Sequence, residues 1–400
     1  MRKSSSIAAT LFVMAITASP LAFAQQPPPA AGVPADWVGC DSTCRAKRAN
    51  PKPDIVSPVV SPDGVVTIKI WAPKAQSVGI GGLEDKVMPA TKGEEGVWTY
   101  TSPKIKPGYE SYYVQIDGVD TVDPNNLWLV GGRSRYENVV AIGGGEEFTR
   151  NDPNIPHGAI AEVFYRTPGV EFERRMRVYT PPGYGLKPEA APLPTLYLLH
   201  GGTGAEDQWP KLGRAGFILD KLIAEGKAKR MIVVMPDGYV DDFRVPSGTS
   251  PDLLTPDMLK GIIPYIEANY AVSKDPKDRA IAGLSRGASQ TFALAREAPG
   301  TFGNVGIFSF SRSRVNPLRK EMEGLKTPEQ WAALRDMLGK AKLLYWSVGT
   351  DDAGYKDSAA IWKLFKGNNV AVVAEAKQGD HDWWVWRESL RDFAEKAFPN

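Results

Sequence analysis

Hydrophobic and polar residues alternate along one part of the chain and gather into continuous apolar runs along another. Alternating segments at 66–71, 96–100 and 112–116 are each bounded by Asp-Gly, Pro-Gly or Gly-Gly. Alternation puts every second side chain on one face of a strand, and short strands with turn signals at this spacing are typical of a β-sandwich. No helical period precedes residue 150. The pattern predicts a β-sandwich domain over 56–145.

The hydrophobic pattern changes at about residue 155, where apolar runs begin to alternate with amphipathic stretches. Predicted strands lie at 159–165, 176–179, 195–199, 231–235, 279–282, 343–346 and 370–374. Predicted helices lie at 217–225, 256–269, 288–297, 328–338, 358–367 and 384–398. Buried strands alternating with helices indicate a mostly parallel sheet with helices on both faces. We therefore expect an α/β domain over 155–400.

The first residues have the pattern of a signal peptide. Met1-Arg2-Lys3 precede a mostly apolar stretch at 7–21, and Ala22-Phe23-Ala24 precede Gln25. This arrangement predicts a signal peptide over 1–24 that is cleaved after Ala24. No other stretch approaches the roughly 20 apolar residues of a membrane-spanning helix. We expect a secreted or periplasmic protein, and the sequence does not decide between the two.

Residues 25–55 are rich in proline and poor in apolar side chains, which predicts an arm or linker without a core of its own. The two cysteines of the chain, Cys40 and Cys44, lie in this arm. An oxidising compartment favours a disulfide, whereas an i,i+4 pair within a helix would strain one, so the pairing stays open. No second Cys or His pair accompanies them, so the spacing matches no zinc signature.

The charge of the chain is nearly balanced. There are 48 basic and 46 acidic residues, a net charge of +2, and no long run of one sign. Without a cationic excess we expect neither a nucleic-acid nor a membrane partner. Neither a metal nor a cofactor is implied, and the oligomeric state is not indicated.

The strongest chemical signal is Gly283-Leu284-Ser285-Arg286-Gly287, which fits G-x-S-x-G between an apolar strand and a helix. That setting is the nucleophile elbow of α/β-hydrolases, a sharp turn that presents the serine hydroxyl and requires small residues two before and two after it. In a chain with 39 glycines the bare pattern can arise by chance. Its strand–turn–helix context favours a catalytic Ser285.

A nucleophilic serine needs a base, and the chain has three histidines. His157 precedes the sheet and His200 belongs to a glycine-rich loop, which leaves His381, after the last predicted strand. The orienting acid should follow the preceding strand, where both Asp351 and Asp352 stand. The resulting order of serine, aspartate and histidine is that of α/β-hydrolases.

Stabilisation of the oxyanion needs backbone N–H donors. Arg286, directly after the serine, supplies one, and the run His200-Gly201-Gly202-Thr203-Gly204 supplies a second, which we assign to Gly202. A phosphate loop is the alternative for such a run, but the Lys and Ser/Thr of the nucleotide-binding motif are missing. The motifs therefore predict acyl transfer.

Residues 155–400 resemble carbohydrate esterase family 1 and the related esterase-D-like group, which includes feruloyl and acetyl xylan esterases. The resemblance rests on segments in matching order: 174–184, 197–202 with Trp209, 263–267, 279–287, and 381–383 followed by Val385-Trp386. It implies that the acid is Asp352, the fourth residue of a G-T-x-D-like stretch, and that Gly202 donates to the oxyanion. Arg286 and Asp380 depart from the G-L-S-M-G-G and glycine-before-histidine patterns of the family, which puts the acyl specificity in doubt.

Residues from about 58 to 143 resemble the immunoglobulin-like, early-set domain related to carbohydrate-binding module family 48. The resemblance rests on Trp71-Ala72-Pro73, Gly96-Val97-Trp98 and Asp123-Pro124-Asn125. It implies that aromatic residues such as Trp128 stack on sugar rings. Burial of these rings in a small core is an equally good explanation.

The leading hypothesis is a serine esterase that removes feruloyl groups from plant cell-wall polysaccharide, with a polysaccharide or small ester as substrate. Trp209, Trp383 and Trp384 are the candidate substrate-binding residues. An acetyl xylan esterase is the nearest alternative. A carbohydrate-binding protein without catalytic activity is the alternative from a different class.

Overall fold

The computed structural model describes residues 53–143, 146–240 and 253–400. The predicted signal peptide, all but the last three residues of the predicted arm, and the cysteine pair lie outside these residues.

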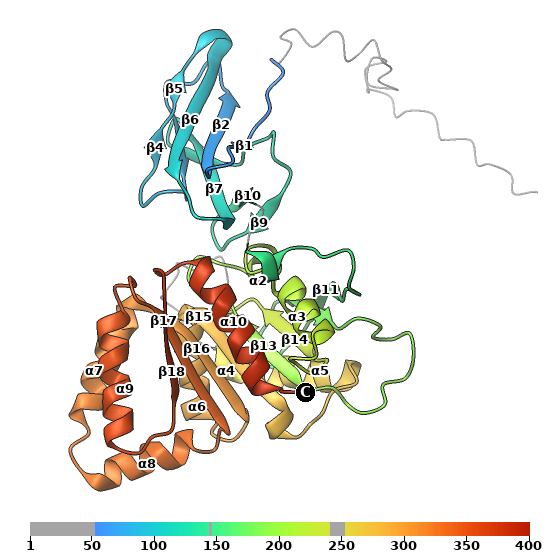
Figure 1. The fold of residues 1–400 in the computed structure, drawn as a ribbon, viewed down its shortest axis with the longest axis vertical. Coiled ribbons are helices and arrows are strands. Elements are labelled where there is room, and N and C mark those ends of the chain that lie inside the picture. Colours follow the sequence, from blue (N-terminus) through green and yellow to red (C-terminus); the bar gives the residue numbers. More distant parts are fainter. Residues whose placement is uncertain (1–52, 144–145, 241–252) are drawn as a thin grey trace, which may run out of the picture. The chain divides into compact units, whose positions relative to one another are not determined.

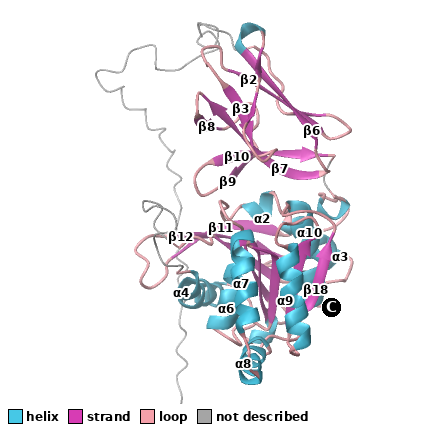
Figure 2. Ribbon diagram, turned by 90° about the vertical axis from the view of Figure 1, so that its left-hand side faces the viewer, coloured by secondary structure: helices cyan, strands magenta, loops and turns pink. Residues whose placement is uncertain are grey.

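Two antiparallel sheets form the first folded segment, and Figure 2 shows it as strands and loops with little helix. One sheet has the order β1-β2-β6-β5 and the other β4-β3-β7-β10-β9, with β8 added beside β7. The bounds are β1 Val59–Val60, β2 Val65–Trp71, β3 Val78–Gly81, β4 Met88–Pro89, β5 Thr91–Lys92, β6 Val97–Lys104, β7 Gly108–Ile116, β8 Val119–Thr121, β9 Leu129–Gly131 and β10 Tyr136–Ile142. The predicted sandwich is present.

The alternation read from the sequence explains the core of the sandwich. In β2 the side chains of Val66, Ile68 and Ile70 are buried while those between them are not. Asp123 is also fully buried, and its carboxylate accepts hydrogen bonds from the hydroxyls of Ser57 (2.7 Å) and Tyr112 (3.0 Å). The Asp-Pro-Asn motif thus has a structural role inside the sandwich.

An eight-stranded sheet forms the α/β segment, with the order β11-β12-β14-β13-β15-β16-β17-β18. From β14 to β18 all neighbours are parallel, whereas β12 is antiparallel to both β11 and β14. The bounds are β11 Ala159–Tyr165, β12 Arg174–Thr180, β13 Thr195–Leu199, β14 Ile232–Pro236, β15 Arg279–Ser285, β16 Asn304–Phe310, β17 Leu343–Gly349 and β18 Val373–Lys377. The central strands β13 to β16 carry almost only buried residues, as expected for a sheet covered on both faces.

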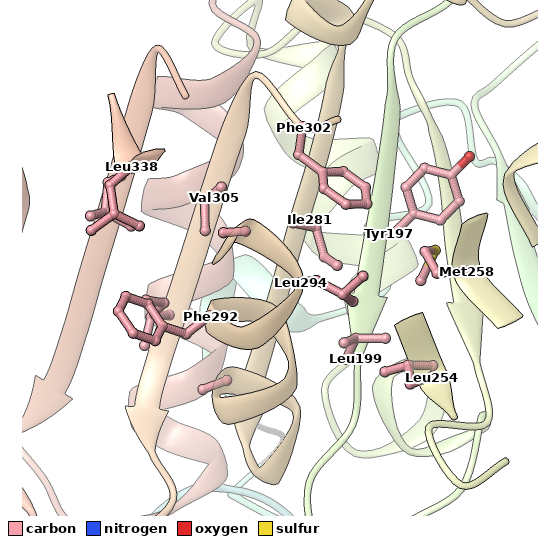
Figure 3. Close-up of a cluster of buried hydrophobic side chains, with 14 of the residues drawn as sticks. Tyr197, Leu199, Leu254, Met258, Ile281, Phe292, Leu294, Phe302, Val305 and Leu338 are labelled. Atoms are coloured by element: carbon pink, nitrogen blue, oxygen red, sulfur yellow. The ribbon is translucent and has the colours of Figure 1, made fainter. Parts of the chain in front are cut away.

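Helices pack on both faces of this sheet (Figure 1). Their bounds are α2 Gln208–Lys211, α3 Ala215–Ala224, α4 Leu254–Asp257, α5 Ile263–Asn269, α6 Arg286–Glu297, α7 Arg312–Gly324, α8 Pro328–Leu338, α9 Tyr355–Gly367 and α10 Trp383–Ala397. One apolar cluster joins the sheet to α4 to α9, and Figure 3 shows Phe292 and Leu294 of α6 beside the strand residues Ile281 and Val305. A second cluster joins the opposite face to α2, α3 and α10.

Within the α/β segment, the sequence pattern did not predict strand β16, helix α7 or the short helix α2. The structure also moves the last strand from 370–374 to 373–377, and it divides the helix predicted at 256–269 into α4, a π-helical turn over Met258–Ile262, and α5. The predicted fold class is otherwise confirmed: a mostly parallel sheet covered by helices, preceded by a β-sandwich.

Buried contacts connect the sandwich to the α/β segment, so Pro53–Asn400 form one compact unit. Arg387 of α10 is fully buried and donates to the carboxylate of Glu146 (2.7 Å), to the carbonyl of Tyr109 (2.7 Å) and to that of Leu212 (2.9 Å). These acceptors satisfy a guanidinium that is withdrawn from solvent, as a buried charge requires.

None of the helices in the part of the chain that the structure describes has the length and apolar character needed to cross a lipid bilayer.

Candidate active site

Ser285 ends strand β15 and immediately precedes helix α6, in the elbow that the motif predicts. Its backbone has φ 52° and ψ −112°, a conformation that non-glycine residues rarely adopt and that marks a strained turn. The turn is possible because its neighbours lack side chains. A Cβ on Gly283 would lie 2.5 Å from the carbonyl carbon of Gly287, and one on Gly287 would lie 2.5 Å from the carbonyl oxygen of His200.

His381 follows β18 and lies between the other two members of the predicted triad. Its Nε2 is 2.8 Å from the hydroxyl of Ser285, and its Nδ1 is 2.6 Å from the carboxylate of Asp352. Since an ionised carboxylate only accepts hydrogen bonds, Nδ1 carries the proton that Asp352 binds, and Nε2 is the nitrogen that accepts from Ser285. The geometry suits transfer of the serine proton to the imidazole.

Asp352 follows β17, and its carboxylate is held from several directions. It is 4% exposed, and besides His381 it accepts from the N–H of Gly354 (2.8 Å) and from Nε of Arg312 (3.3 Å). Burial by itself raises the pKa of Asp352, but the hydrogen bond from His381, followed by the nearby charges, brings this pKa below its ordinary value. Asp352 therefore stays ionised through the neutral range.

The structure decides between the two aspartates that the sequence leaves open. Asp351 is exposed, and its backbone N–H donates to the carbonyl of Gly379. The aspartates that flank His381 have other partners: Asp380 accepts from Arg312 at 2.6 Å, and Asp382 caps helix α10 by accepting from the N–H of Val385 at 3.0 Å.

The two predicted oxyanion donors lie on either side of Ser285. Arg286 is the first residue of α6, so its backbone N–H belongs to the first helical turn, where N–H groups point toward the end of the helix next to Ser285. The loop with Gly202 approaches from the end of β13, and a Cβ on Gly201 would lie 3.5 Å from the Cβ of Ser285. Around Gly202 no atom would lie within 4 Å of an added Cβ, which leaves space for a ligand.

The other two histidines have structural partners. His200 is 2% exposed; its Nε2 accepts from the N–H of Gly238 (2.8 Å), so its Nδ1 carries the proton and donates to the carbonyl of Gly201 (2.8 Å). A longer contact of 3.4 Å joins Nε2 to Asp237, but a nitrogen that accepts the amide proton cannot also donate there. His157 binds Asp220 through Nδ1 at 2.9 Å. Neither contacts Ser285.

Two of the three tryptophans assigned to substrate binding are core residues, which corrects that assignment. Trp209 is 1% exposed and donates to the carbonyl of Leu199, and Trp383 is 8% exposed with its ring edge-on to that of Trp209. Their rings therefore pack against each other in the core and are not available to a substrate. Trp384 is half-buried and packs beside the same cluster, so its substrate contact stays a prediction.

The structure adds two residues to the site that the motifs did not indicate, Arg312 and Tyr239. Arg312 bridges Asp352 and Asp380 as described above. The ring of Tyr239 lies 3.9 Å from the guanidinium carbon of Arg286 and 4.0 Å from that of Arg133, and its hydroxyl accepts from the N–H of Thr203 at 3.0 Å. Arg286 therefore stacks on Tyr239, beside the serine that it follows in sequence.

A cleft of about 510 Å³ borders this loop region. Aromatic rings, charged side chains and the glycine loop contribute to its wall, which is lined by Gly132, Arg133, Phe164, Phe172, Glu173, Arg174, Arg175, Gly204, Ala205, Asp237 and Tyr239. Such a mixture suits a ligand with both apolar faces and hydroxyl groups. Among the described residues there is no cluster of three or more His, Cys, Asp or Glu side chains able to hold a metal ion.

The strand order, the elbow and the line from serine through histidine to aspartate define the class of the protein as an α/β-hydrolase. Residues 168–396, more than half of the chain, match the Esterase family, described as "Putative esterase". The chain belongs to this family and is a carboxylic ester hydrolase.

Comparisons with individual proteins relate the chain to feruloyl esterases. A protein of Xylanibacter ruminicola named endo-1,4-beta-xylanase/feruloyl esterase is 34% identical over 355 residues, which are 85% of this chain and 46% of that protein. The chain spans about half the length of the curated relatives that it matches.

Solved structures show the same fold. A carbohydrate esterase family 1 ferulic acid esterase from Anaeromyces mucronatus, in complex with ferulic acid, has a TM-score of 0.50 at 21% identity, covering 62% of this chain and 94% of its own. The enterobactin esterase of Shigella flexneri has a TM-score of 0.58 at 14% identity, covering 83% of this chain and 92% of its own. The second likeness extends beyond the α/β segment.

Proposed function

We propose that this chain is an exported serine esterase that releases feruloyl groups from plant cell-wall polysaccharide. The observation that carries the catalytic part is the line of two hydrogen bonds from Ser285 through His381 to Asp352. The acyl and polysaccharide parts are supported by the 34% identical relative named xylanase/feruloyl esterase.

The proposed reaction follows the usual course of acyl transfer. The hydroxyl oxygen of Ser285 attacks the ester carbonyl while Nε2 of His381 takes its proton, and Asp352 stabilises the imidazolium. The N–H groups of Gly202 and Arg286 stabilise the oxyanion. The imidazolium of His381 then gives its proton to the departing ester oxygen, which leaves as the sugar hydroxyl, and the acyl group stays on Ser285. Water, deprotonated by His381, attacks the acyl-serine, releases ferulate and restores the serine.

The cleft beside Tyr239 supports a sugar as the leaving group. Phe164 is 52% exposed and lines the cleft together with Phe172, so aromatic faces are available to the apolar faces of sugar rings. Glu173 and Arg175 offer an acceptor and donors to hydroxyl groups at the same wall.

A substrate panel tests the proposal. Methyl ferulate, p-nitrophenyl acetate and acetylated xylan are offered to the intact protein and to Ser285→Ala, with circular dichroism to verify that both fold. We expect release of ferulate by the intact protein and none above background by the variant. Hydrolysis of acetylated xylan without hydrolysis of methyl ferulate would identify an acetyl xylan esterase instead. A folded protein that hydrolyses nothing and is not labelled by a fluorophosphonate would be a carbohydrate-binding protein.

Export is the second part of the proposal, supported by the pattern of residues 1–24. N-terminal sequencing of protein recovered from the periplasm or medium should begin at Gln25. Recovery of the chain from the cytoplasm with Met1 intact would contradict export.

Sugar binding by the sandwich is the third part, and it rests on the resemblance to carbohydrate-binding module family 48. Trp98 is buried and Trp128 packs edge-on to Tyr109 at 5.8 Å. Trp71, which is half-buried, is therefore the best placed of these three tryptophans for a sugar. Affinity electrophoresis of the full chain through xylan, in the Ser285→Ala background, should show retardation that Trp71→Ala reduces. Equal mobility with and without xylan would contradict sugar binding by the sandwich.

A further inference from the structure

The sandwich contacts the loop that carries the predicted oxyanion donor. Residues just after β9 run beside residues 203–204. Gly132 and Gly204 form an isolated antiparallel bridge, and the N–H of Arg133 donates to the carbonyl of Thr203 at 2.9 Å. Thr203 directly follows Gly202. The acceptor of this hydrogen bond from the sandwich is therefore the residue next to the predicted oxyanion donor.

Asp207, at the other end of the loop 200–207, binds strand β9 of the sandwich. It is 5% exposed, and its two carboxylate oxygens accept from the N–H of Gly131 at 3.0 and 3.1 Å. The ammonium of Lys211 donates to Asp207 at 2.7 Å and to the carbonyl of Leu129 at 2.6 Å. A buried carboxylate that binds one ammonium and one amide N–H holds a fixed geometry.

The loop between these attachments needs support from outside. Thr203 has φ 61°, a left-handed conformation that threonine seldom adopts and that persists only where the surroundings enforce it. The N–H of Thr203 donates to Tyr239 of the α/β segment while its carbonyl accepts from Arg133 of the sandwich. Both backbone groups of Thr203, the residue after Gly202, are thus held: the N–H by the α/β segment and the carbonyl by the sandwich.

We propose that β9 and the residues after it position the oxyanion donor of Gly202, with Asp207 as the positioning residue. The inference rests on the proposed esterase mechanism. It assigns the sandwich a part in turnover of every ester, including small soluble ones that make no contact with a carbohydrate-binding surface.

The test uses the full chain and p-nitrophenyl acetate. In Asp207→Ala the attachment is lost, and we expect kcat to fall about 10- to 100-fold with KM changed less than about twofold, since a displaced donor weakens only the transition state. A boronic acid, which forms a tetrahedral adduct with the serine, should bind more weakly by a similar factor, while inhibition by ferulate stays the same. Asp207→Asn keeps an acceptor for the N–H of Gly131 and should recover part of the rate.

Two further variants separate positioning from general loosening. Lys211→Met removes the cation at a partly exposed site and should lower kcat in the same sense if Asp207→Ala does not fold. Glu146→Gln weakens the buried ion pair with Arg387, also between the sandwich and the α/β segment, but does not touch residues 200–207. It should lower the melting temperature and leave kcat unchanged.

Unchanged kcat in Asp207→Ala, or in Lys211→Met should the first not fold, would overturn the inference. So would a loss of kcat in Glu146→Gln as large as in the Asp207 and Lys211 variants, because the effect would then follow stability alone. Failure of the proposed function looks different, since the unmodified chain would then hydrolyse no ester.

Discussion

Asp352 and Asp351 are neighbours of identical chemistry, yet only one of them has the environment of an orienting acid. Asp352 is buried, ionised and bonded to His381, and Asp351 is exposed. A buried carboxylate fixes the imidazole tautomer and stabilises the positive charge that forms during proton transfer. An exposed carboxylate would be screened by water and would fix neither.

The pair provides a matched test. Asp352→Asn should lower kcat about 10³- to 10⁴-fold, because an amide in place of the carboxylate no longer stabilises the imidazolium and favours the wrong tautomer. Asp351→Asn removes the same charge one residue away and should leave kcat within about twofold. Steady-state hydrolysis of methyl ferulate measures both, and equal losses in the two variants would contradict the assignment.

Residues that belong to local motifs could be proposed from the sequence, and residues that meet across the fold could not. The elbow around Ser285 and the order of serine, aspartate and histidine are visible along the chain. The contact of Asp207 with Gly131, in contrast, joins positions 76 residues apart, and neither stands in a motif. Trp209 and Trp383 were assigned to the substrate because a sequence shows that a residue is aromatic but does not show its burial.

Among the elements, the turn between β15 and α6 has little room for side chains. The two glycines around Ser285 bring the start of α6 against the end of β13, where the oxyanion loop begins. Backbone atoms, which cannot rotate aside as a flexible side chain can, occupy the space that any larger residue at these positions would need.

Substituting these glycines should therefore be costly. Gly287→Ala would place a Cβ 2.5 Å from the carbonyl oxygen of His200 and should destabilise the protein by about 2 kcal/mol or more while abolishing turnover. Gly324→Ala, at the end of α7 with no atom within 4 Å, should be neutral or stabilise by up to about 1 kcal/mol. Thermal unfolding of both variants compares the costs, and a Gly287→Ala protein as stable as the parent would refute the packing argument.

The elements that the pattern did not predict have identifiable causes. Strand β16 is buried along its whole length, so it lacks the alternation that marks a half-exposed strand. Helix α7 contains Pro317, a residue that ordinarily interrupts a helix, and it carries few apolar side chains. Arg312, which contacts the predicted acid Asp352, begins this helix and is not predicted for the same reason.

At the scale of the whole molecule, charged groups are buried where the sandwich meets the α/β segment. Glu146 and Arg387 form a buried ion pair there, and Glu110 of β7, which is half-buried, interacts electrostatically with both and with Asp382. Burial, with Asp382 and Glu146 adding to it and Arg387 opposing it, raises the pKa of Glu110 to about 7.

This shift predicts a pH-dependent stability. The folded protein retains the proton of Glu110 up to about pH 7, whereas the unfolded chain loses it near 4.5, so this residue makes the free energy of unfolding fall as pH rises between those values. Glu110→Gln should reduce the difference in melting temperature between pH 5 and pH 8. Glu94→Gln, at an exposed position, is the control. A parent-like difference in Glu110→Gln would contradict the raised pKa.

The position of Arg387 limits how the sandwich can be exchanged for that of another protein. Helix α10 starts two residues after His381. Four positions further on, Arg387 donates to the carboxylate of Glu146 and to the carbonyl of Tyr109 in the sandwich. A chimera that exchanges the first 150 residues for those of an unrelated protein would leave this buried guanidinium without its carboxylate partner. The free energy of unfolding should fall by about 3–5 kcal/mol. The sandwich and the α/β segment should therefore be exchanged together, and recombination libraries should place their crossovers outside Pro53–Asn400.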